Sequence, residues 1–291
     1  MPAPRVLIES RSRIGESPVW HPRENALYWV DVEGGTIHRW HADDGSVHTW
    51  DAGEPVGCIG LRRRGGLVGA RRSGFFFLDT GSGRFRPIAD PEADMPDNRL
   101  NDGKVDRRGR FWAGTRNFVD TAQASGALYR LDADLSVHRM ETGLRCPNGM
   151  AWSPDDGRMY LCDTWARRIC VYDFDPERGT ISNRRLFREL PDEEGFPDGL
   201  TVDAEGCIWN AHYDGWRITR YAPDGTIEKV VRMPVRNVTS VTFGRKQAGS
   251  LFATTSWLRL AGHEQREQLS AGHVFEVDIG VTGIAEPAFA G

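Results

Sequence analysis

Short apolar stretches and short polar turns alternate along almost the whole chain of 291 residues. Stretches such as Leu27–Val30 and Arg168–Asp173 are rich in aromatic and β-branched residues, and Gly and Asp are frequent in the turns between stretches. Short runs of this kind, bounded by turn residues, are typical of β-strands. The pattern therefore predicts a protein built from short strands, with few helices.

The same strand and turn phrase recurs along the chain. Residues 17–31 and 149–163 share Trp, Pro, Tyr and a final Asp at a constant offset of 132 residues, without a gap. Further copies, two of them weaker, begin at or near Gly57, Asn101, Asp198 and Thr239. The chain therefore contains six copies of one unit.

This repeat predicts the architecture. Each copy holds about four short strands at a period of about 41–50 residues, which is typical of a propeller blade, since one blade cannot bury both of its faces alone. A β-sandwich would also have short strands, but not six equivalent units. We predict an all-β, six-bladed β-propeller with four-stranded blades, with residues 1–291 as a single domain. The strand around Arg5–Ile8 should complete the sixth blade beside residues 273–277, which would close the ring.

Composition and charge narrow the range of partners. A net charge of about -4, with both signs interspersed, gives no general attraction to nucleic acid or to an anionic membrane. No apolar segment could span a bilayer, and the first residues lack the apolar core of a secretory signal. The five cysteines are odd in number and lack CxxC spacing. We expect a cytoplasmic protein that acts on a small molecule, and the sequence leaves its oligomeric state open.

The repeat also marks one equivalent position in every blade. If the copies are blades, the residue just before each first strand lies on the loop that enters the innermost strand, at the mouth of the central channel. In chain order these residues are Glu16, Gly57, Asn101, Asn148, Asp198 and Thr239.

Four of these six residues carry carboxylate or carboxamide side chains, which suit a hard divalent cation. Asn and Asp are also common turn residues that cap backbone groups. Four such residues in phase around one axis, however, favour one metal ion at the channel mouth. We expect calcium first, with zinc, manganese, magnesium or iron as alternatives.

Other side chains are expected near the same mouth. Arg99 stands two residues before Asn101, and its guanidinium could hold a hydroxyl-rich or anionic ligand. It could equally be a surface arginine paired with Asp97 or Asp102. The loops after the second strands return to the same face, where aromatic residues could stack on a sugar ring or pack between blades. These loops carry Arg116, Asn117, Asp120, Trp165, His212, Tyr213 and Trp257.

Four segments, Gly15–Trp20, Asn98–Lys104, Pro147–Met150 and Pro197–Leu200, together resemble the SMP-30/gluconolactonase/regucalcin-like family. The resemblance runs from about Ile14 to Phe275. It implies that the metal ligands are Glu16, Asn148 and Asp198. It also implies that Arg99 and Asn101 face the substrate, with Asn101 able to reach the metal through water.

The resemblance further implies a metal-dependent hydrolase that opens a sugar aldonolactone, as a gluconolactonase or arabinolactonase does. The metal would act as a Lewis acid on the lactone carbonyl, and Asp198 would take the proton of the attacking water. A calcium-binding propeller without enzymatic activity and an organophosphate hydrolase are the alternatives. Gly57 and Thr239 supply no strong ligand, which leaves the coordination open and favours catalysis.

One departure from the family pattern affects the expected substrate. Mammalian relatives carry a Glu-Glu pair after the Gly-Thr of the third blade, whereas here Gly114-Thr115 is followed by Arg116-Asn117. The substrate contact that a glutamate makes there is therefore not expected in this chain, and the identity of the sugar is left open.

Overall fold

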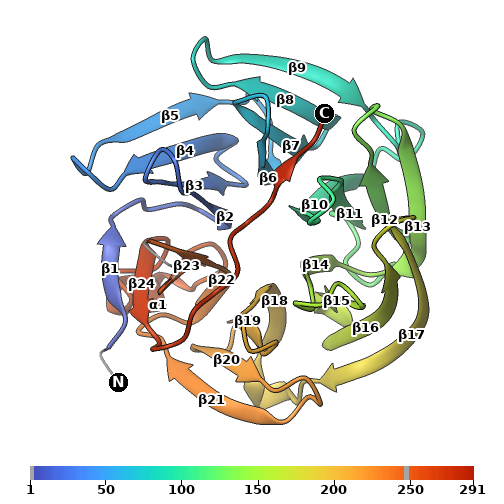
Figure 1. Cartoon of the computed structure of the whole chain (residues 1–291). Helices are drawn as coiled ribbons and strands as arrows, with labels where there is room; N and C mark the ends of the chain where they lie inside the picture. Colours follow the sequence, from blue (N-terminus) through green and yellow to red (C-terminus); the bar gives the residue numbers. More distant parts are fainter. Residues whose placement is uncertain (1–2, 246–248) are drawn as a thin grey trace.

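Six antiparallel sheets stand around a central axis in the computed structural model, which describes residues 3–245 and 249–291 (Figure 1). The first strand of each blade lies next to the axis, and the last strand lies at the rim. Six blades of four strands each agree with the architecture that the repeat predicts, so that prediction is confirmed.

The first three blades follow one another along the chain, each as a simple meander. Blade one comprises β2 (Gly15–His21), β3 (Ala26–Asp31), β4 (Thr36–His41) and β5 (Val47–Asp51). Blade two comprises β6 (Val56–Arg62), β7 (Leu67–Arg71), β8 (Gly74–Asp79) and β9 (Arg84–Ala89). Blade three comprises β10 (Asn98–Val105), β11 (Phe111–Asn117), β12 (Gly126–Leu131) and β13 (Val137–Leu144).

The next two blades continue the ring in the same way. A short 3-10 helix, η1 (Thr164–Ala166), lies within blade four, and a second, η2 (Asp192–Glu194), connects blade four to blade five. Blade four comprises β14 (Pro147–Trp152), β15 (Arg158–Asp163), β16 (Arg168–Asp175) and β17 (Thr180–Glu189). Blade five comprises β18 (Phe196–Val202), β19 (Ile208–Tyr213), β20 (Arg217–Tyr221) and β21 (Ile227–Arg232).

The sixth blade joins the two ends of the chain. It comprises β22 (Asn237–Gly244), β23 (Ser250–Ser256), β24 (Val274–Asp278) and β1 (Arg5–Ile8). Strand β1 pairs antiparallel with β24, so that Val6 lies opposite Phe275. The predicted closure of the ring by the N-terminal strand is therefore confirmed. Closure protects the edges that an open ring would expose.

The repeated Asp and Trp have a shared structural role. In blade three, Asp106 accepts a hydrogen bond from Trp112 Nε1 at 2.9 Å and also binds backbone N–H groups of its own turn. In blade five, Asp203 and Trp209 make the same side-chain contact at 2.9 Å. Because the buried indole N–H needs an acceptor, the turn and the following strand are specified together.

Apolar side chains fill the spaces between blades. The buried residues form six hydrophobic clusters, one between each pair of neighbouring blades. Trp29, Trp112 and Trp209 are among the largest fully buried side chains. Burial of a large apolar side chain contributes roughly 1.5–3 kcal/mol, so the blades stabilise one another across these interfaces.

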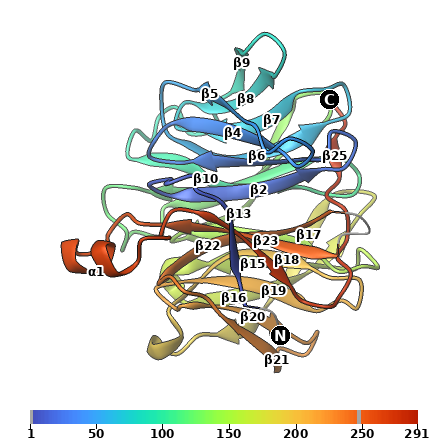
Figure 2. The ribbon, with the colours of Figure 1, turned by 90° about the vertical axis from the view of Figure 1, so that its left-hand side faces the viewer.

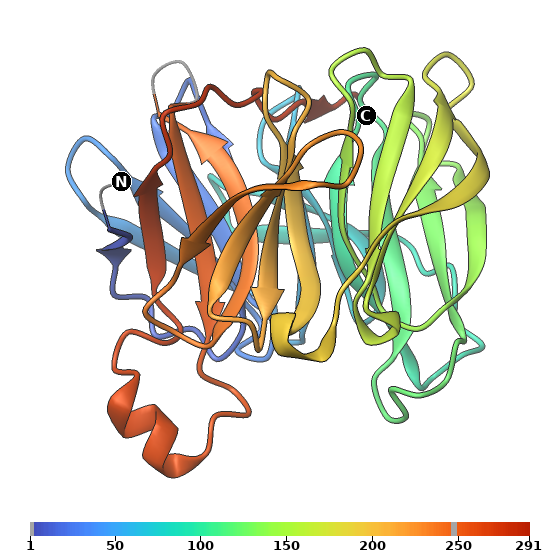
Figure 3. The same cartoon turned by 90° about the horizontal axis from the view of Figure 1, so that it is seen from below.

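Two additions to the ring lie at opposite ends of the channel (Figures 2 and 3). Helix α1 (Gly262–Glu267) projects from one end, between β23 and β24. At the other end the C-terminal segment (residues 279–291) crosses the channel (Figure 1) and adds β25 (Ala288–Phe289) to β6 as a parallel fifth strand. No described helix has the length and apolar character needed to cross a membrane.

Candidate active site

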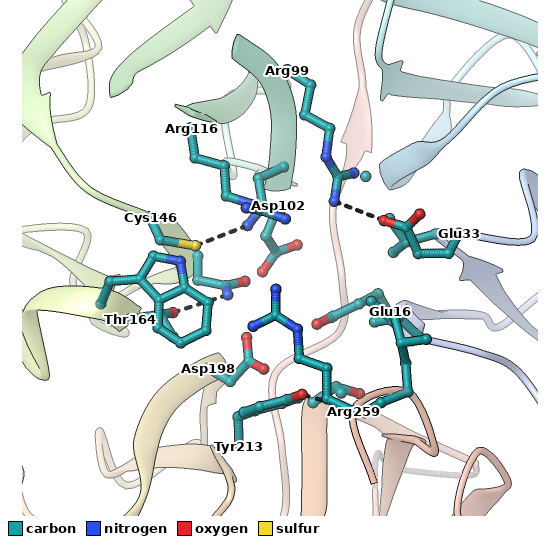
Figure 4. Close-up of a pocket in the computed structure, with 18 residues that line it drawn as sticks. Glu16, Glu33, Arg99, Asp102, Arg116, Cys146, Thr164, Asp198, Tyr213 and Arg259 are labelled. Atoms are coloured by element: carbon teal, nitrogen blue, oxygen red, sulfur yellow. Dashed lines mark hydrogen bonds and ion pairs between the residues drawn. The ribbon is translucent and has the colours of Figure 1, made fainter. Parts of the chain in front are cut away.

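A pocket opens at the α1 end of the channel (Figure 4). Its lining includes the equivalent position of every blade: Glu16, Gly57, Asn101, Asn148, Asp198 and Thr239. The structure therefore brings all six positions together around one cavity.

These positions differ from the expectation in one respect, because they lie inside the first strands rather than on loops before them. Asn148 follows the first residue of β14, and Asp198 is the third residue of β18. Strand pairing shifts register between Pro147 and Met150, and again between Pro197 and Leu200. A bulge of this kind redirects a side chain, and the repeat could not indicate where strand pairing begins.

Aspartates at the ends of the second strands hold the chain in place before two of these positions. Asp31 accepts a hydrogen bond from the backbone N–H of Ile14 at 3.1 Å, and Asp163 accepts one from Cys146 at 2.8 Å. Each anchored N–H lies two residues before the candidate metal ligand of its blade. The final Asp of the repeated phrase thus positions the start of the inner strand.

Glycines after two candidate ligands allow the inner strands to pack closely. A Cβ at Gly149 would collide with the backbone of Leu200, and one at Gly199 would collide with Ser240 in the next blade. The Asn-Gly and Asp-Gly pairs therefore combine a polar side chain for the pocket with a backbone that tolerates close approach.

Two acidic side chains of the pocket, Glu16 and Asp198, are buried and have no ion-pair partner among the described residues. Burial raises the pKa of both Glu16 and Asp198 well above the usual range for carboxyl groups. The charge of Asp198 adds to the effect on Glu16, and the charge of Asp102 raises both. Like charges that converge in a buried site favour either protonation or a bound cation.

Among the described residues that line the pocket, two buried oxygen atoms have no hydrogen-bond partner, Asn148 Oδ1 and Asp198 Oδ1. The amide nitrogen of Asn148 donates to Thr164 Oγ1 at 3.0 Å, and this hydroxyl donates to the carbonyl of Pro197 at 2.8 Å. The amide is thus held by its nitrogen, and its oxygen is left without a donor. Together with Glu16, these atoms fit a divalent cation.

The fit depends on the carboxamide. Within residues 3–245 and 249–291, no three His, Cys, Asp or Glu side chains are arranged to hold a metal ion by themselves. Two carboxylates and one amide oxygen are a hard-oxygen donor set, which suits calcium, magnesium or manganese better than a soft metal.

Asp102 is a third buried carboxylate, and it borders both the pocket and the channel behind it. Burial raises its pKa to about 6. From the sequence, Asp102 was expected only as a partner for Arg99. Its position next to Asn101 could have indicated that it lines the channel, because a bulged inner strand can direct two successive side chains to the same side.

Arg99 is a pocket residue and not a surface residue. It is 5% exposed, and its Nη2 lies 3.3 Å from Glu33 Oε1, so its partner is neither Asp97 nor Asp102. Its Nη1 is buried without a hydrogen-bond partner. Burial, reinforced by the nearby charge of Arg116, lowers the pKa of Arg99 to about 10.

Asn101 lines the pocket, but both ends of its amide are engaged within the protein. Its Nδ2 donates to the carbonyl of Pro147 at 3.1 Å, and its Oδ1 accepts from Arg116 Nε at 3.2 Å. Arg116 therefore contributes a positive charge to the pocket, in the segment where the family resemblance implies a glutamate.

Trp165 and Tyr213 line the pocket, as expected. The Trp165 ring packs edge-on against Phe196, with ring centroids 5.3 Å apart, and Arg259 lies over it at 5.7 Å. The Tyr213 hydroxyl is directed to the carbonyl of Leu258 at 3.5 Å. Trp165 therefore both packs against its neighbours and faces the pocket.

Asn117 and Asp120, which were expected in the lining, are not part of it. Asn117 Oδ1 accepts backbone N–H bonds from Val119 and Asp120, which folds this segment into a local turn. His212 is also absent, since its ring is fully buried behind the pocket wall. Trp257 instead donates its Nε1 to the carbonyl of Arg11, at 3.2 Å.

Two further charged residues of the lining, Glu33 and Arg259, were not predicted from the sequence. Arg259 precedes α1, in an excursion that the other blades lack, so no repeat phase could mark it. Its backbone φ of 66° is uncommon for a residue other than glycine, and its side chain points into the pocket (Figure 4).

Comparisons with known proteins agree on one family. A family model described as SMP-30/Gluconolactonase/LRE-like region matches residues 14–257. The chain is 38% identical over 288 residues to the 6-deoxy-6-sulfogluconolactonase of Pseudomonas putida, covering 99% of this chain and 98% of the relative. It is 35% identical over 291 residues to the pentonolactonase XacC of Haloferax volcanii, covering 96% of each.

The fold is likewise similar to that of a solved relative. A crystal structure described as a calcium-binding protein, regucalcin, from Agrobacterium tumefaciens superposes with a TM-score of 0.94. The sequence identity is 27%, and the match covers 99% of this chain and 97% of that one. The likeness therefore extends over the whole propeller.

Proposed function

Because this chain belongs to the SMP-30/gluconolactonase/LRE-like family, we propose that it hydrolyses a sugar lactone to the open-chain acid with the help of one divalent cation. The observation that carries this proposal is the pair of unpartnered buried oxygens, Asn148 Oδ1 and Asp198 Oδ1, that line one pocket. The names of the two relatives, a sulfogluconolactonase and a pentonolactonase, support a lactone as the substrate.

Glu16, Asn148 and Asp198 would hold the cation. When bound, it would supply a positive charge that polarises the lactone carbonyl and favours attack by water. Asp198 has a second carboxylate oxygen, which can accept the proton of the attacking water. The new bond joins the water oxygen to the carbonyl carbon, the ring C–O bond breaks, and the released ring oxygen takes up the proton.

Arg99 and Asn101 are proposed to bind the substrate. The unpartnered Nη1 of Arg99 is a donor that a ring hydroxyl or the carbonyl oxygen can accept. Asn101 is more constrained, since its amide already bonds Pro147 and Arg116. Its contribution is therefore to fix the Arg116 guanidinium beside the substrate, in addition to any direct contact.

The rival function is a calcium-binding protein in which the ion only ties the blades together. The open side of the donor set supports catalysis instead. Gly57 has no side chain, and Thr239 Oγ1 is engaged with the carbonyl of Gly15 and the hydroxyl of Thr254. Two of the six equivalent positions thus provide no ligand, which leaves room for substrate and water.

The test is a hydrolysis assay over a panel of pentono- and hexonolactones, with acid release followed for metal-loaded, chelator-treated and metal-reconstituted protein. We expect at least one lactone to be opened well above its spontaneous rate, with activity lost to chelator and restored by metal. Tight binding of one ion without metal-dependent hydrolysis of any lactone would favour the calcium-binding function.

A further inference from the structure

Three arginine side chains gather at the pocket from separate parts of the chain: Arg99 from β10, Arg116 from β11 and Arg259 from the segment before α1 (Figure 4). Of these three arginines, only Arg99 has a carboxylate partner among the described residues, which is Glu33. Arg116 is held by the side chain of Asn101 and the carbonyl of Asn117. These neutral partners position its guanidinium without neutralising it.

The charge balance of the pocket becomes positive when a divalent cation is bound. The ionisable acids of the lining are Glu16, Glu33, Asp102 and Asp198. Four negative side chains, three arginines and a doubly charged cation leave one net positive charge. Glu16 and Asp198 are the acids assigned to the cation, and Glu33 neutralises Arg99. Asp102 then offsets one of the two remaining arginines, Arg116 and Arg259, which leaves one positive charge between them.

An unused donor lies among these charges. Arg99 Nη1 is buried without an acceptor, and the whole residue is only 5% exposed. A sugar hydroxyl can accept hydrogen bonds but carries no charge, so it would leave the charge of the half-buried Arg116 guanidinium uncompensated. An oxyanion accepts several such bonds and balances the charge as well.

We propose that the preferred substrate is a lactone that carries a negatively charged substituent, a carboxylate, sulfonate or phosphate, and that Arg116 and Arg259 are the residues that select it. The free Nη1 of Arg99 is the third donor of this anion subsite. The inference rests on the proposed lactonase function and narrows its substrate class.

The first experiment compares matched lactones on the metal-loaded protein. Its probes are glucono-1,5-lactone and analogues with a carboxylate, a sulfonate or a phosphate at the sixth carbon, which separates the three sources of charge. We expect kcat/KM for at least one charged lactone to exceed that of the neutral lactone by about tenfold or more. Added salt should raise KM for the charged lactone more than for the neutral one.

The second experiment uses Arg116→Gln and Arg259→Gln, with Arg266→Gln as the matched control. Arg266 lies in α1, in the same excursion as Arg259, and both residues are exposed, but only Arg259 lines the pocket. Both pocket variants should reduce the ratio of charged to neutral kcat/KM by about tenfold, whereas the control should leave it unchanged. Calorimetry with the ring-opened charged product should show the same loss of binding, at unchanged metal affinity.

The outcomes separate this inference from the proposed function. Hydrolysis of the neutral lactone with no preference for any charged analogue would overturn the anion subsite and leave the lactonase intact. A preference that persists in both variants would overturn the assignment to Arg116 and Arg259. If no lactone of either kind is hydrolysed, the proposed function itself is wrong.

Discussion

The two ends of the central channel differ in whether their buried polar groups have partners. At the α1 end, Asp198 and Asn148 present oxygens without partners to the pocket. At the other end, Glu286 of the C-terminal segment lies 2.9 Å from Lys104 Nζ and accepts a bond from Thr242 Oγ1 at 3.2 Å. One end leaves buried oxygens without partners, and at the other end the C-terminal segment supplies the partners.

This difference distinguishes polar groups that stabilise the fold from polar groups that are available to bind a ligand. Lys104 and Glu286 neutralise each other, and Lys104 also donates to the carbonyl of Leu200 at 3.3 Å. Glu16 and Asp198 have no such ion-pair partner among the described residues, so their burial destabilises the metal-free fold. Removing an unpaired buried charge at the pocket end should therefore raise the free energy of unfolding. Removing one member of the ion pair at the other end should lower it.

The largest expected effect is the loss of metal from the pocket. Asp198→Ala and Asn148→Ala each remove one proposed ligand. We expect metal affinity to fall by more than about 100-fold, because mutating a residue that only hydrogen-bonds to a metal ligand already lowers metal affinity by about 10–100-fold. Lactone kcat/KM should fall by about 1000-fold or more. Calorimetric metal titration and circular dichroism would test this, and stoichiometric binding by both folded variants would exclude the site.

A smaller effect should separate substrate binding from metal binding. Arg99→Ala removes a charged hydrogen-bond donor whose described partner is Glu33, which is not one of the proposed metal ligands. Losing a charge-assisted hydrogen bond of about 1.5–3 kcal/mol should lower kcat/KM about 10- to 100-fold, with metal affinity nearly unchanged. Kinetics and metal titration on the same sample would measure both. A kinetically silent variant would remove Arg99 from the substrate site.

The next prediction tests the comparison directly in metal-free protein. Asp198→Asn removes a repelling charge at almost constant volume and should raise the free energy of unfolding by about 1–2 kcal/mol. Glu286→Gln leaves Lys104 without its partner and should lower the free energy of unfolding by about 2 kcal/mol. Urea denaturation of the two variants and the unmodified protein would give both values. Effects of the same sign would contradict the contrast between the two ends.

The smallest expected effect concerns His212, a buried residue whose two ring nitrogens already have partners within the protein. His212 Nδ1 lies 2.8 Å from the carbonyl of Glu194, its Nε2 lies 3.3 Å from Tyr221, and burial lowers its pKa to about 3. The unfolded state therefore binds a proton more readily, and stability falls as pH drops below about 6.5.

Between pH 7 and pH 6 this group alone should remove about 0.7 kcal/mol of stability. His212→Gln keeps hydrogen-bonding capacity without titrating in this range, so the loss should be absent from that variant. Urea denaturation of metal-loaded protein at both pH values would measure the difference. An equal pH dependence in the two proteins would show that His212 does not titrate on unfolding.

The sequence by itself determined the number of blades and the ring closure, because a repeated unit folds in the same way in each copy. The match of Trp20 to Trp152 marked equivalent strands, and their phase led to Glu16, Asn148 and Asp198 as side chains of one pocket. This inference needed only the symmetry of a propeller, in which residues at the same phase face the same axis.

Only the tertiary structure decided what surrounds those three residues. Glu33 and Arg259 lie outside the repeated phrase, and Glu286 reaches the channel from a segment that no blade repeats. The bulges that direct Asn148 and Asp198 inward depend on pairing with the next strand. Such contacts join parts of the chain that are distant in sequence and have no counterpart in the other blades. They therefore cannot be predicted from residue spacing or composition.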